Sequence, residues 1–170
     1  MRDATLCMLV RGDPPRELLL GMKKARFGAG KYNGFGGKVE PSETIVEAAV
    51  RELAEEAGVR VAPGDLHPVA QLAFVFPYRR EWEQLVHVYY ICRWQGTPVE
   101  SEEMAPAWFR VDEIPYDQMW DDDRYWLPHV LAGERIRATF VYQADNETVE
   151  RFEISEWNGD RITQRDAEKG

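Results

Sequence analysis

The sequence contains little cysteine. Its 170 residues include only Cys7 and Cys92, and both lie in apolar runs that are typical of small core residues. No repeated cysteine or cysteine–histidine spacing is present, which argues against a zinc-bound or disulfide-linked scaffold. A chain of this length can bury roughly two-thirds of its extended surface, so it needs neither to fold.

Long apolar runs and excess positive charge are also missing. No stretch approaches the roughly 20 apolar residues of a membrane span, and residues 1–10 are too short for a signal peptide. We therefore expect a cytoplasmic protein. The net charge of −9 argues against binding to a nucleic acid polymer or an anionic membrane. It leaves open a small phosphorylated ligand bridged by divalent cations.

Strand and helix patterns alternate along the chain, which predicts an α/β (α+β) domain with a mixed β-sheet between helices. We assign residues 1–156 to a single domain and residues 157–170 to a loose polar tail. Seven segments have the apolar content and bounding turns of strands. They are residues 4–10, 17–22, 67–76, 84–94, 107–111, 136–143 and 148–154.

Two helices are expected. The first begins after Pro41, with Ser42 as its N-cap, and ends at Gly58 as its C-cap. The second lies near residues 121–131 and ends at Gly133. The glycine-rich stretch at residues 23–37, before the first helix, is expected to be a loop.

The first helix carries a cluster of acids. Glu52, Glu55 and Glu56 stand at i, i+3 and i+4, so they share one helical face and repel one another. Arg51 cannot fully compensate, because it points about 100° away from Glu52. Oxygen ligands without histidine or cysteine are what Mg²⁺ or Mn²⁺ prefers. A solvated acidic face would be the ordinary alternative, but the glycine-rich loop and capped helix around these acids favour a metal site.

This stretch resembles the catalytic box of the Nudix hydrolases, G-x5-E-x7-R-E-U-x-E-E-x-G-U, where U is a bulky aliphatic residue. Every fixed position of the pattern is matched within 23 residues, which makes a chance match very improbable. The matching residues are Gly37, Glu43, Arg51, Glu52, Leu53, Glu55, Glu56, Gly58 and Val59.

The resemblance implies roles for these residues. Glu52, Glu55 and Glu56 would hold Mg²⁺ with help from the Gly37 carbonyl, and one of these acids would orient or deprotonate the attacking water. The metal would offset diphosphate charge and lower the pKa of that water. Arg51 would form a structural salt bridge with Glu43 that orients the metal ligands.

Four stretches outside the box are similar to one branch, the MutT-type hydrolases that remove oxidised purine nucleoside triphosphates, especially the animal form. They are residues 19–38, 74–76, 96–109 and 114–128. This resemblance implies that Asn33 hydrogen-bonds the purine, that Asp122 and Asp123 read its Watson–Crick edge, and that Trp120 stacks on it. Two adjacent buried carboxylates tend to share a proton, so one can donate while the other accepts.

The same resemblance implies the remaining walls of the pocket. Phe27, Phe74 and Met104 would line the cavity, Lys23 would lie near the sugar or phosphates, and Glu103 would be an additional metal ligand. Taken singly, these residues have ordinary explanations as core side chains, turn residues or solvated charges. Asp122 and Asp123 could simply be acids at a helix N-terminus.

Three departures from the animal pattern stand out. Asp121 makes a run of three acids, which could raise the pKa values of its neighbours or move the helix start. Residues 6–8 lie where the animal form has a pocket threonine, so we expect a more apolar wall there. Residues 77–84 also differ in composition.

We therefore expect a Mg²⁺-dependent hydrolase that sanitises the nucleotide pool as a monomer. It would convert 8-oxo-dGTP or 2-oxo-dATP to the monophosphate and pyrophosphate. A first alternative is another nucleoside diphosphate derivative as substrate, such as ADP-ribose or a methylated purine triphosphate. A second is a nucleotide-binding module without catalysis, which the complete set of glutamates disfavours.

Overall fold

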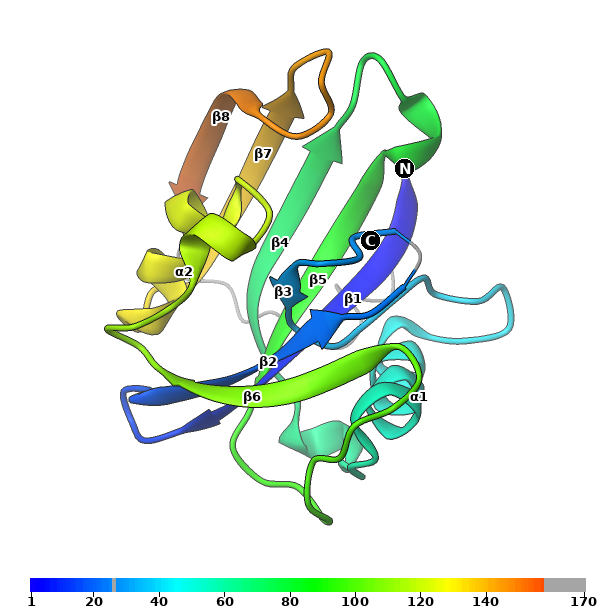
Figure 1. The fold of residues 1–170 in the computed structure, drawn as a ribbon, viewed down its shortest axis with the longest axis vertical. Coiled ribbons are helices and arrows are strands. Elements are labelled where there is room, and N and C mark those ends of the chain that lie inside the picture. The colour runs from blue at the N-terminus through cyan, green and yellow to red at the C-terminus, as the bar shows by residue number, and fades with distance from the viewer. Residues whose placement is uncertain (26, 158–170) are drawn as a thin grey trace.

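The fold comes from a computed structural model, which describes residues 1–25 and 27–157 (Figure 1). Eight strands form one mixed sheet in the order β3-β2-β1-β5-β4-β7-β8, and β6 pairs with the full length of β2. The β1–β5 and β4–β7 pairs are parallel and the remaining pairs are antiparallel. The strands are β1 Arg2–Arg11, β2 Glu17–Lys23, β3 Tyr32–Asn33, β4 His67–Val75, β5 Gln84–Ile91, β6 Met104–Arg110, β7 Ile136–Tyr142 and β8 Val149–Glu156.

The helices α1, Ile45–Ala57, and α2, Asp123–Leu131, pack on opposite faces of this sheet. Alternation along β1 shows the division, because Met8 belongs to the core under α2 whereas Cys7 and Leu9 belong to the core under α1. Successive side chains of a strand point to opposite faces, so one strand serves both cores. The predicted mixed sheet between helices is confirmed.

Helix α1 begins two residues later than its predicted start, because Thr44 and not Ser42 is the N-cap. The Glu47 amide donates to Thr44 Oγ1 at 3.1 Å, and the Thr44 amide donates to Glu47 Oε1 at 2.9 Å. This reciprocal capping box satisfies two amides that the first turn leaves unpaired. Gly58 ends the helix with a φ of 69°, as predicted, a conformation that glycine adopts without strain.

Three strand predictions need correction. β6 begins at Met104 and not at residue 107, because it pairs with the full length of β2, from Lys23↔Met104 to Glu17↔Arg110. The loop expected at residues 23–37 contains the short strand β3. β5 ends at Ile91, so Cys92 lies beyond the strand and is exposed, whereas Cys7 is buried as expected.

Trp157 is the one residue of the predicted tail that the structure describes. Trp157 is buried, donates its amide hydrogen to the Arg135 carbonyl, and lies beneath the Arg137 guanidinium at 4.2 Å. The rest of the predicted tail, residues 158–170, lies outside the described residues. In the described part of the chain, no helix is long and apolar enough to cross a membrane.

A glycine allows the loop before α1 to lie directly on β1. A Cβ at Gly36 would lie 1.9 Å from the Thr5 carbonyl oxygen, and a backbone atom cannot move aside as a flexible side chain can. On either side of this glycine, Cys7 forms a bridge with Phe35 and Ala4 with Lys38. The close approach holds the loop between β1 and the second half of α1, where the Gly36 amide donates to Glu56.

We predict that Gly36→Ala lowers the free energy of unfolding by about 3 kcal/mol or more, because the added methyl group cannot be accommodated without moving backbone. Gly64→Ala is the matched control, since a Cβ there meets no atom within 4 Å, and it should change stability by about 0.5 kcal/mol or less. Urea unfolding of both variants measures this. Equal stability of the two variants would contradict the close-packing account.

Candidate active site

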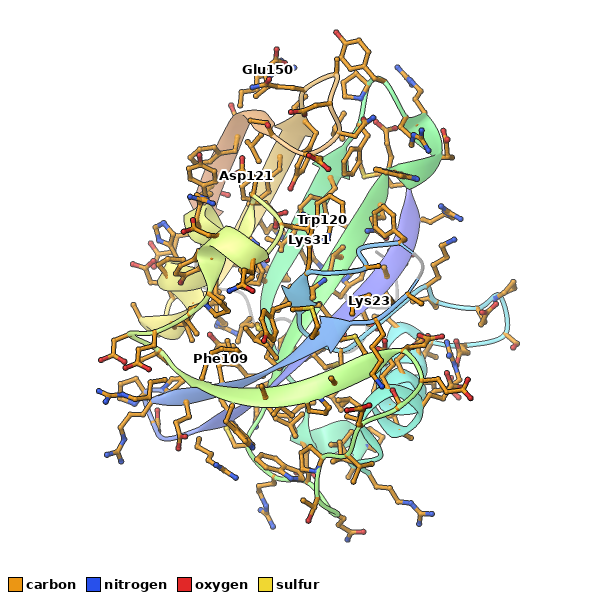
Figure 2. The ribbon with its side chains drawn as sticks, viewed as in Figure 1. Lys23, Lys31, Phe109, Trp120, Asp121 and Glu150 are labelled. Carbon is orange, nitrogen blue, oxygen red and sulfur yellow. The ribbon has the colours of Figure 1, made fainter. Side chains whose placement is uncertain are left out.

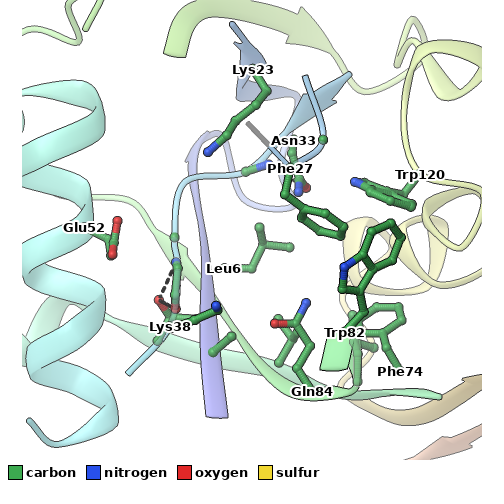
Figure 3. A pocket seen from close by; sticks show the side chains of 18 of the residues that line it. Leu6, Lys23, Phe27, Asn33, Lys38, Glu52, Phe74, Trp82, Gln84 and Trp120 are labelled. Carbon is green, nitrogen blue, oxygen red and sulfur yellow. Dashed lines mark hydrogen bonds between the residues drawn. The ribbon is translucent and has the colours of Figure 1, made fainter. Parts of the chain in front are cut away.

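One cavity of about 630 Å³ brings together every residue that the sequence assigned to the site. Figure 3 shows its two ends, with Glu52 on α1 at one end and the rings of Phe27, Trp82 and Trp120 gathered at the other. The predicted residues on its walls are Lys23, Phe27, Asn33, Gly37, Arg51, Glu52, Glu55, Glu56, Phe74, Glu103, Met104, Trp120, Asp122 and Asp123.

Arg51 organises the acids at the α1 end. Its Nε lies 2.6 Å from Glu43 Oε2 and its Nη2 lies 2.8 Å from Glu43 Oε1, a two-pronged pairing. The hydrogen bond from Arg51 lowers the pKa of Glu43. Arg51 Nη1 also reaches Glu52 Oε1 at 2.8 Å and Glu55 Oε2 at 3.3 Å. The expectation that Arg51 points away from Glu52 was wrong, because its side chain is long enough to bend across the helix face.

Glu56 is the most deeply buried acid of α1, with 3% of its surface exposed. It accepts a hydrogen bond from the Gly36 amide at 2.7 Å. Burial raises its pKa to about 7 against that hydrogen bond, and the charge of Glu52 raises it further. Burial likewise raises the pKa of Glu52.

Lys23 lies between two acids from different elements. Its Nζ lies 4.0 Å from Glu56 Oε2 and 3.6 Å from Glu103 Oε2. The lysine from β2 therefore joins the helix carboxylates to the segment that leads into β6. Glu103 is placed beside the α1 acids although it lies 47 residues beyond Glu56 in the chain.

The donor atoms at this end suit a hard divalent cation. They are carboxylate oxygens from Glu52, Glu55, Glu56 and Glu103, with the Gly37 backbone against them, since a Cβ at Gly37 would lie 2.6 Å from Glu52 Oε1. Within residues 1–25 and 27–157, no three such side chains converge on one point, and Arg51 and Lys23 form ion pairs with them. Oxygen-only ligands with uncompensated negative charge fit Mg²⁺ or Mn²⁺ in chemistry.

Aromatic rings form the other end of the cavity. Phe27 stacks on Trp120 with ring centroids 5.2 Å apart and an interplanar angle of 28°, and its edge meets Trp82 at 4.6 Å. Lys31 Nζ lies 5.3 Å from the centroid of the Trp120 ring (Figure 2). A flat ring is the ligand that such a set of aromatic faces accommodates.

Asp122 and Asp123 lie at the start of α2 and are 4% and 3% exposed. Asp122 occupies the N-cap position, yet its side chain makes no cap hydrogen bond. Its oxygens accept instead from Tyr142 Oη at 2.5 Å and from Trp126 Nε1 at 2.8 Å. The explanation of this pair as ordinary helix-end acids therefore does not fit Asp122.

Burial raises the pKa values of both acids. Hydrogen bonds from Tyr142 and Trp126 act against this at Asp122, whereas the neighbouring charge of Asp122 pushes the pKa of Asp123 still higher. Asp123 Oδ2 is buried and has no hydrogen-bond partner among the described residues. Burial thus favours a protonated carboxyl in this pair on the wall of the cavity.

Asn33 lies on the cavity wall, whereas Asp121 lies outside the cavity. Asn33 lines it, while its Oδ1 accepts from the Gly34 amide at 2.9 Å, as in an ordinary turn. Asp121 does not line the cavity, because its carboxylate accepts from the Val149 amide at 2.8 Å and pairs with Arg124 at 3.2 Å. The third acid of the run therefore fastens the start of α2 to β8.

The cavity includes one wall that the sequence analysis expected and several residues, among them Trp82, Gln84 and Tyr142, that it did not assign to the site. Leu6 provides the apolar wall expected at residues 6–8, while Cys7 and Met8 are buried in the two cores. Trp82 and Gln84 belong to residues 77–84, whose composition differs from the animal pattern. That difference was the only sign in the sequence that this stretch reaches the cavity. Tyr142 lies in a late strand and only the pairing of β7 beside β4 brings it to the cavity.

We predict that Glu56→Gln stabilises the metal-free protein at alkaline pH. Burial raises the folded pKa of Glu56 to about 7. The protonated side chain therefore contributes stability that is fully present below its unfolded pKa and is lost as pH rises through about 7. A shift of this size corresponds to about 3 kcal/mol, which glutamine avoids.

Urea unfolding in EDTA at pH 5 and pH 8.5 measures this difference. Glu55→Gln is the control, because the Glu55 side chain is 60% exposed. Its stability should differ from that of the parent by the same amount at both pH values. If Glu56→Gln were no more stable than the parent at pH 8.5, the ionised Glu56 carboxylate would not lower the free energy of unfolding, which would contradict this prediction.

Comparison with known proteins places this geometry in a family. Residues 1–130 match the model of the NUDIX domain. An oxidized purine nucleoside triphosphate hydrolase of Mus musculus is 43% identical over 156 residues, which cover 92% of this chain and 97% of the relative. The protein of the same name from Danio rerio is 45% identical over 150 residues, 88% of this chain and 94% of the relative.

A solved structure agrees with these sequence matches. The mutator MutT protein from Bacillus halodurans superposes with a TM-score of 0.76 at 25% identity, over 91% of this chain and 98% of that one. Sequence pattern, carboxylate helix and fold lead to one assignment. The chain belongs to the Nudix hydrolase family.

Proposed function

We propose that this enzyme hydrolyses oxidised purine nucleoside triphosphates, such as 8-oxo-dGTP and 2-oxo-dATP, to the monophosphate and pyrophosphate. The observation that carries the proposal is the single cavity with acids of α1 at one end and the Asp122–Asp123 pair with aromatic rings at the other. A nucleotide has the same polarity, with a charged phosphate chain at one end and a flat ring at the other.

The relatives support the substrate class. The mouse and zebrafish proteins are named for the hydrolysis of oxidised purine nucleoside triphosphates, and the similarity covers nearly their whole length. It extends well beyond the box that all Nudix enzymes share, into the residues that would contact a base. Fold alone would say little about the substrate.

Glu52, Glu55, Glu56 and Glu103, with the Gly37 carbonyl, would hold Mg²⁺, and Mn²⁺ would also suit these oxygens. When bound, the metal supplies charge neutralisation for the phosphate chain and lowers the pKa of a bound water. Arg51 keeps the carboxylates of Glu52 and Glu55 in place through the contacts described above. Lys23 can move from the acids to a phosphate oxygen, since it is linked to them only by ion pairs.

Glu56 is the best candidate for the general base. Its carboxylate is the most deeply buried of the α1 acids and lines the cavity, where a base must lie within reach of the attacking water. In the proposed step, water oxygen forms a bond to a phosphorus of the triphosphate chain, its proton passes to a carboxylate, and the bond between that phosphorus and the bridging oxygen breaks. Pyrophosphate and the nucleoside monophosphate are released.

The aromatic end would bind the base. Trp120 would stack on the purine once Phe27 leaves its face, a contact worth about 1–3 kcal/mol. Asn33, Asp122 and Asp123 would hydrogen-bond the edge of the ring, while Phe74 and Met104 would fill the space beside it. We also infer a cytoplasmic monomer that acts on free nucleotides, not on a nucleic acid polymer.

We predict a clear preference for oxidised purines when pyrophosphate release is measured with Mg²⁺ at equal concentrations of substrate. The substrates compared are 8-oxo-dGTP, 2-oxo-dATP, dGTP, dATP, a methylated purine triphosphate and ADP-ribose. Hydrolysis of ADP-ribose is measured by the release of AMP. Equal or faster turnover of ADP-ribose, the methylated nucleotide or undamaged dGTP would retain the Nudix assignment and reject the sanitising role.

We predict that Glu56→Gln abolishes turnover while the metal-free fold is retained. The expected loss is at least ~100-fold in kcat, because a positioned base contributes at least that factor. A thermal melt of the variant in EDTA provides the control, since loss of activity in a folded or stabilised protein cannot come from unfolding. Unchanged nucleotide binding together with no turnover by the parent itself would instead indicate a silent binding module.

A further inference from the structure

The two acids that face the base end are not equivalent. Asp122 accepts two hydrogen bonds from protein donors, one from Tyr142 Oη on β7 and one from Trp126 Nε1 on α2, and each reaches a different carboxylate oxygen. Hydrogen bonds from neutral donors to a carboxylate favour its ionised form. Asp122 is thus held as an acceptor from two elements.

Asp123 has the opposite surroundings. Burial raises the pKa of Asp123, the charge of Asp122 raises it further, and Trp126 alone acts against this, without the tyrosine hydroxyl that Asp122 has. Besides Asp122, the titratable groups that interact with Asp123 are Tyr142 and Tyr116, the latter in the 3-10 turn Tyr116–Gln118, and burial and Asp123 raise the pKa values of both tyrosines. Both tyrosines are neutral at neutral pH, so neither adds a negative charge that would act on the Asp123 carboxyl.

We propose that Tyr142 is a positioning residue that fixes the shared proton on Asp123, so that the pair offers a ligand one fixed order of donor and acceptor. The proposal rests on the proposed function, because it assumes that the pair reads a purine edge. It goes beyond the expectation that the two acids share a proton, because it says which of them keeps that proton. Tyr142 itself emerged only from the structure.

The consequence is selectivity between bases. Oxidised guanine and oxidised adenine differ in the order of donors and acceptors along the Watson–Crick edge. A pair with a mobile proton can match either edge, whereas a pair with a fixed proton matches one and must rearrange for the other. Asp123 Oδ2, buried at the cavity wall without a partner among the described residues, is the atom left for that recognition.

Tyr142→Phe tests the proposal, because it removes one hydroxyl and keeps the ring that stacks on Phe76 at 4.6 Å. Tyr90→Phe is a matched control, since the Tyr90 hydroxyl is also buried in the same core and has no hydrogen-bond partner among the described residues. Steady-state kinetics with 8-oxo-dGTP and 2-oxo-dATP give kcat and KM for each protein.

We expect the ratio of kcat/KM for the two substrates to move toward one by about tenfold in Tyr142→Phe, the size expected from the loss of a hydrogen bond to a charged group. The change should appear in KM, because the hydroxyl contacts the base-reading pair and not the α1 acids. Tyr90→Phe should leave the ratio within about twofold of the parent. An unchanged ratio in Tyr142→Phe, or the same change in Tyr90→Phe, would overturn the proposal.

A substrate-free measurement separates this proposal from the proposed function. Carbon-13 NMR titration of the aspartate carboxyls, assigned with Asp122→Asn and Asp123→Asn, should show Asp122 ionised and Asp123 protonated at neutral pH. In Tyr142→Phe the pKa of Asp122 should rise and the two signals should approach each other. Identical titrations in both proteins would refute the role of Tyr142, even if purine triphosphates proved not to be substrates.

Discussion

Negative charge buried without enough compensation is the constraint on which this structure depends. Glu56 at one end of the cavity, and Asp122 and Asp123 at the other, are buried, and Glu52 is partly buried beside Glu56. An unpaired buried carboxylate is costly, and a protein escapes that cost by pairing it, by binding a cation or by protonating it. The two ends of the cavity use different escapes.

The α1 end relies on cations. Arg51 belongs to the protein and satisfies Glu43, Glu52 and Glu55 at once, but Glu56 is left with a distant lysine and one backbone amide. Its pKa is raised because the ionised carboxylate is buried without enough positive charge beside it. In a metal-dependent hydrolase such an excess of carboxylate is the source of metal affinity, and stability is given up where activity needs it.

The α2 end relies on a proton. No cation is paired with Asp122 or Asp123 among the described residues, and the hydrogen bonds of Tyr142 and Trp126 decide which acid stays ionised. A proton held in a known place is a hydrogen-bond donor that no neutral amide could replace at the same position. In the proposed function, charge at the α1 end would serve the chemistry, and charge at the α2 end would serve recognition of the base.

The local pattern of the sequence was enough to predict much of this arrangement. The spacing of Glu52, Glu55 and Glu56 fixed their common face, and Gly58 fixed the end of the helix, because both follow from helix geometry alone. The resemblance outside the box brought Asn33, Trp120 and the aspartate pair into the same pocket. The N-cap was misplaced because Ser42 and Thr44 both have suitable hydroxyls, and only Thr44 has a glutamate three residues later.

What could not be predicted depends on long-range pairing. Tyr142 reaches Asp122 only because β7 pairs with β4 and α2 packs against that part of the sheet. The reach of Arg51 to three carboxylates depends on side-chain conformation, which helical angles do not determine. β6 was predicted too short because Pro106 interrupts its pattern, yet an edge strand tolerates proline.

The most direct test of the account is a crystal structure of the protein with Mn²⁺ and the monophosphate of 8-oxo-deoxyguanosine, with the manganese located by its anomalous scattering. The account predicts manganese bound by the α1 glutamates and the base held between Trp120 and the Asp122–Asp123 pair. Manganese bound elsewhere, or a base outside this end of the cavity, would contradict it.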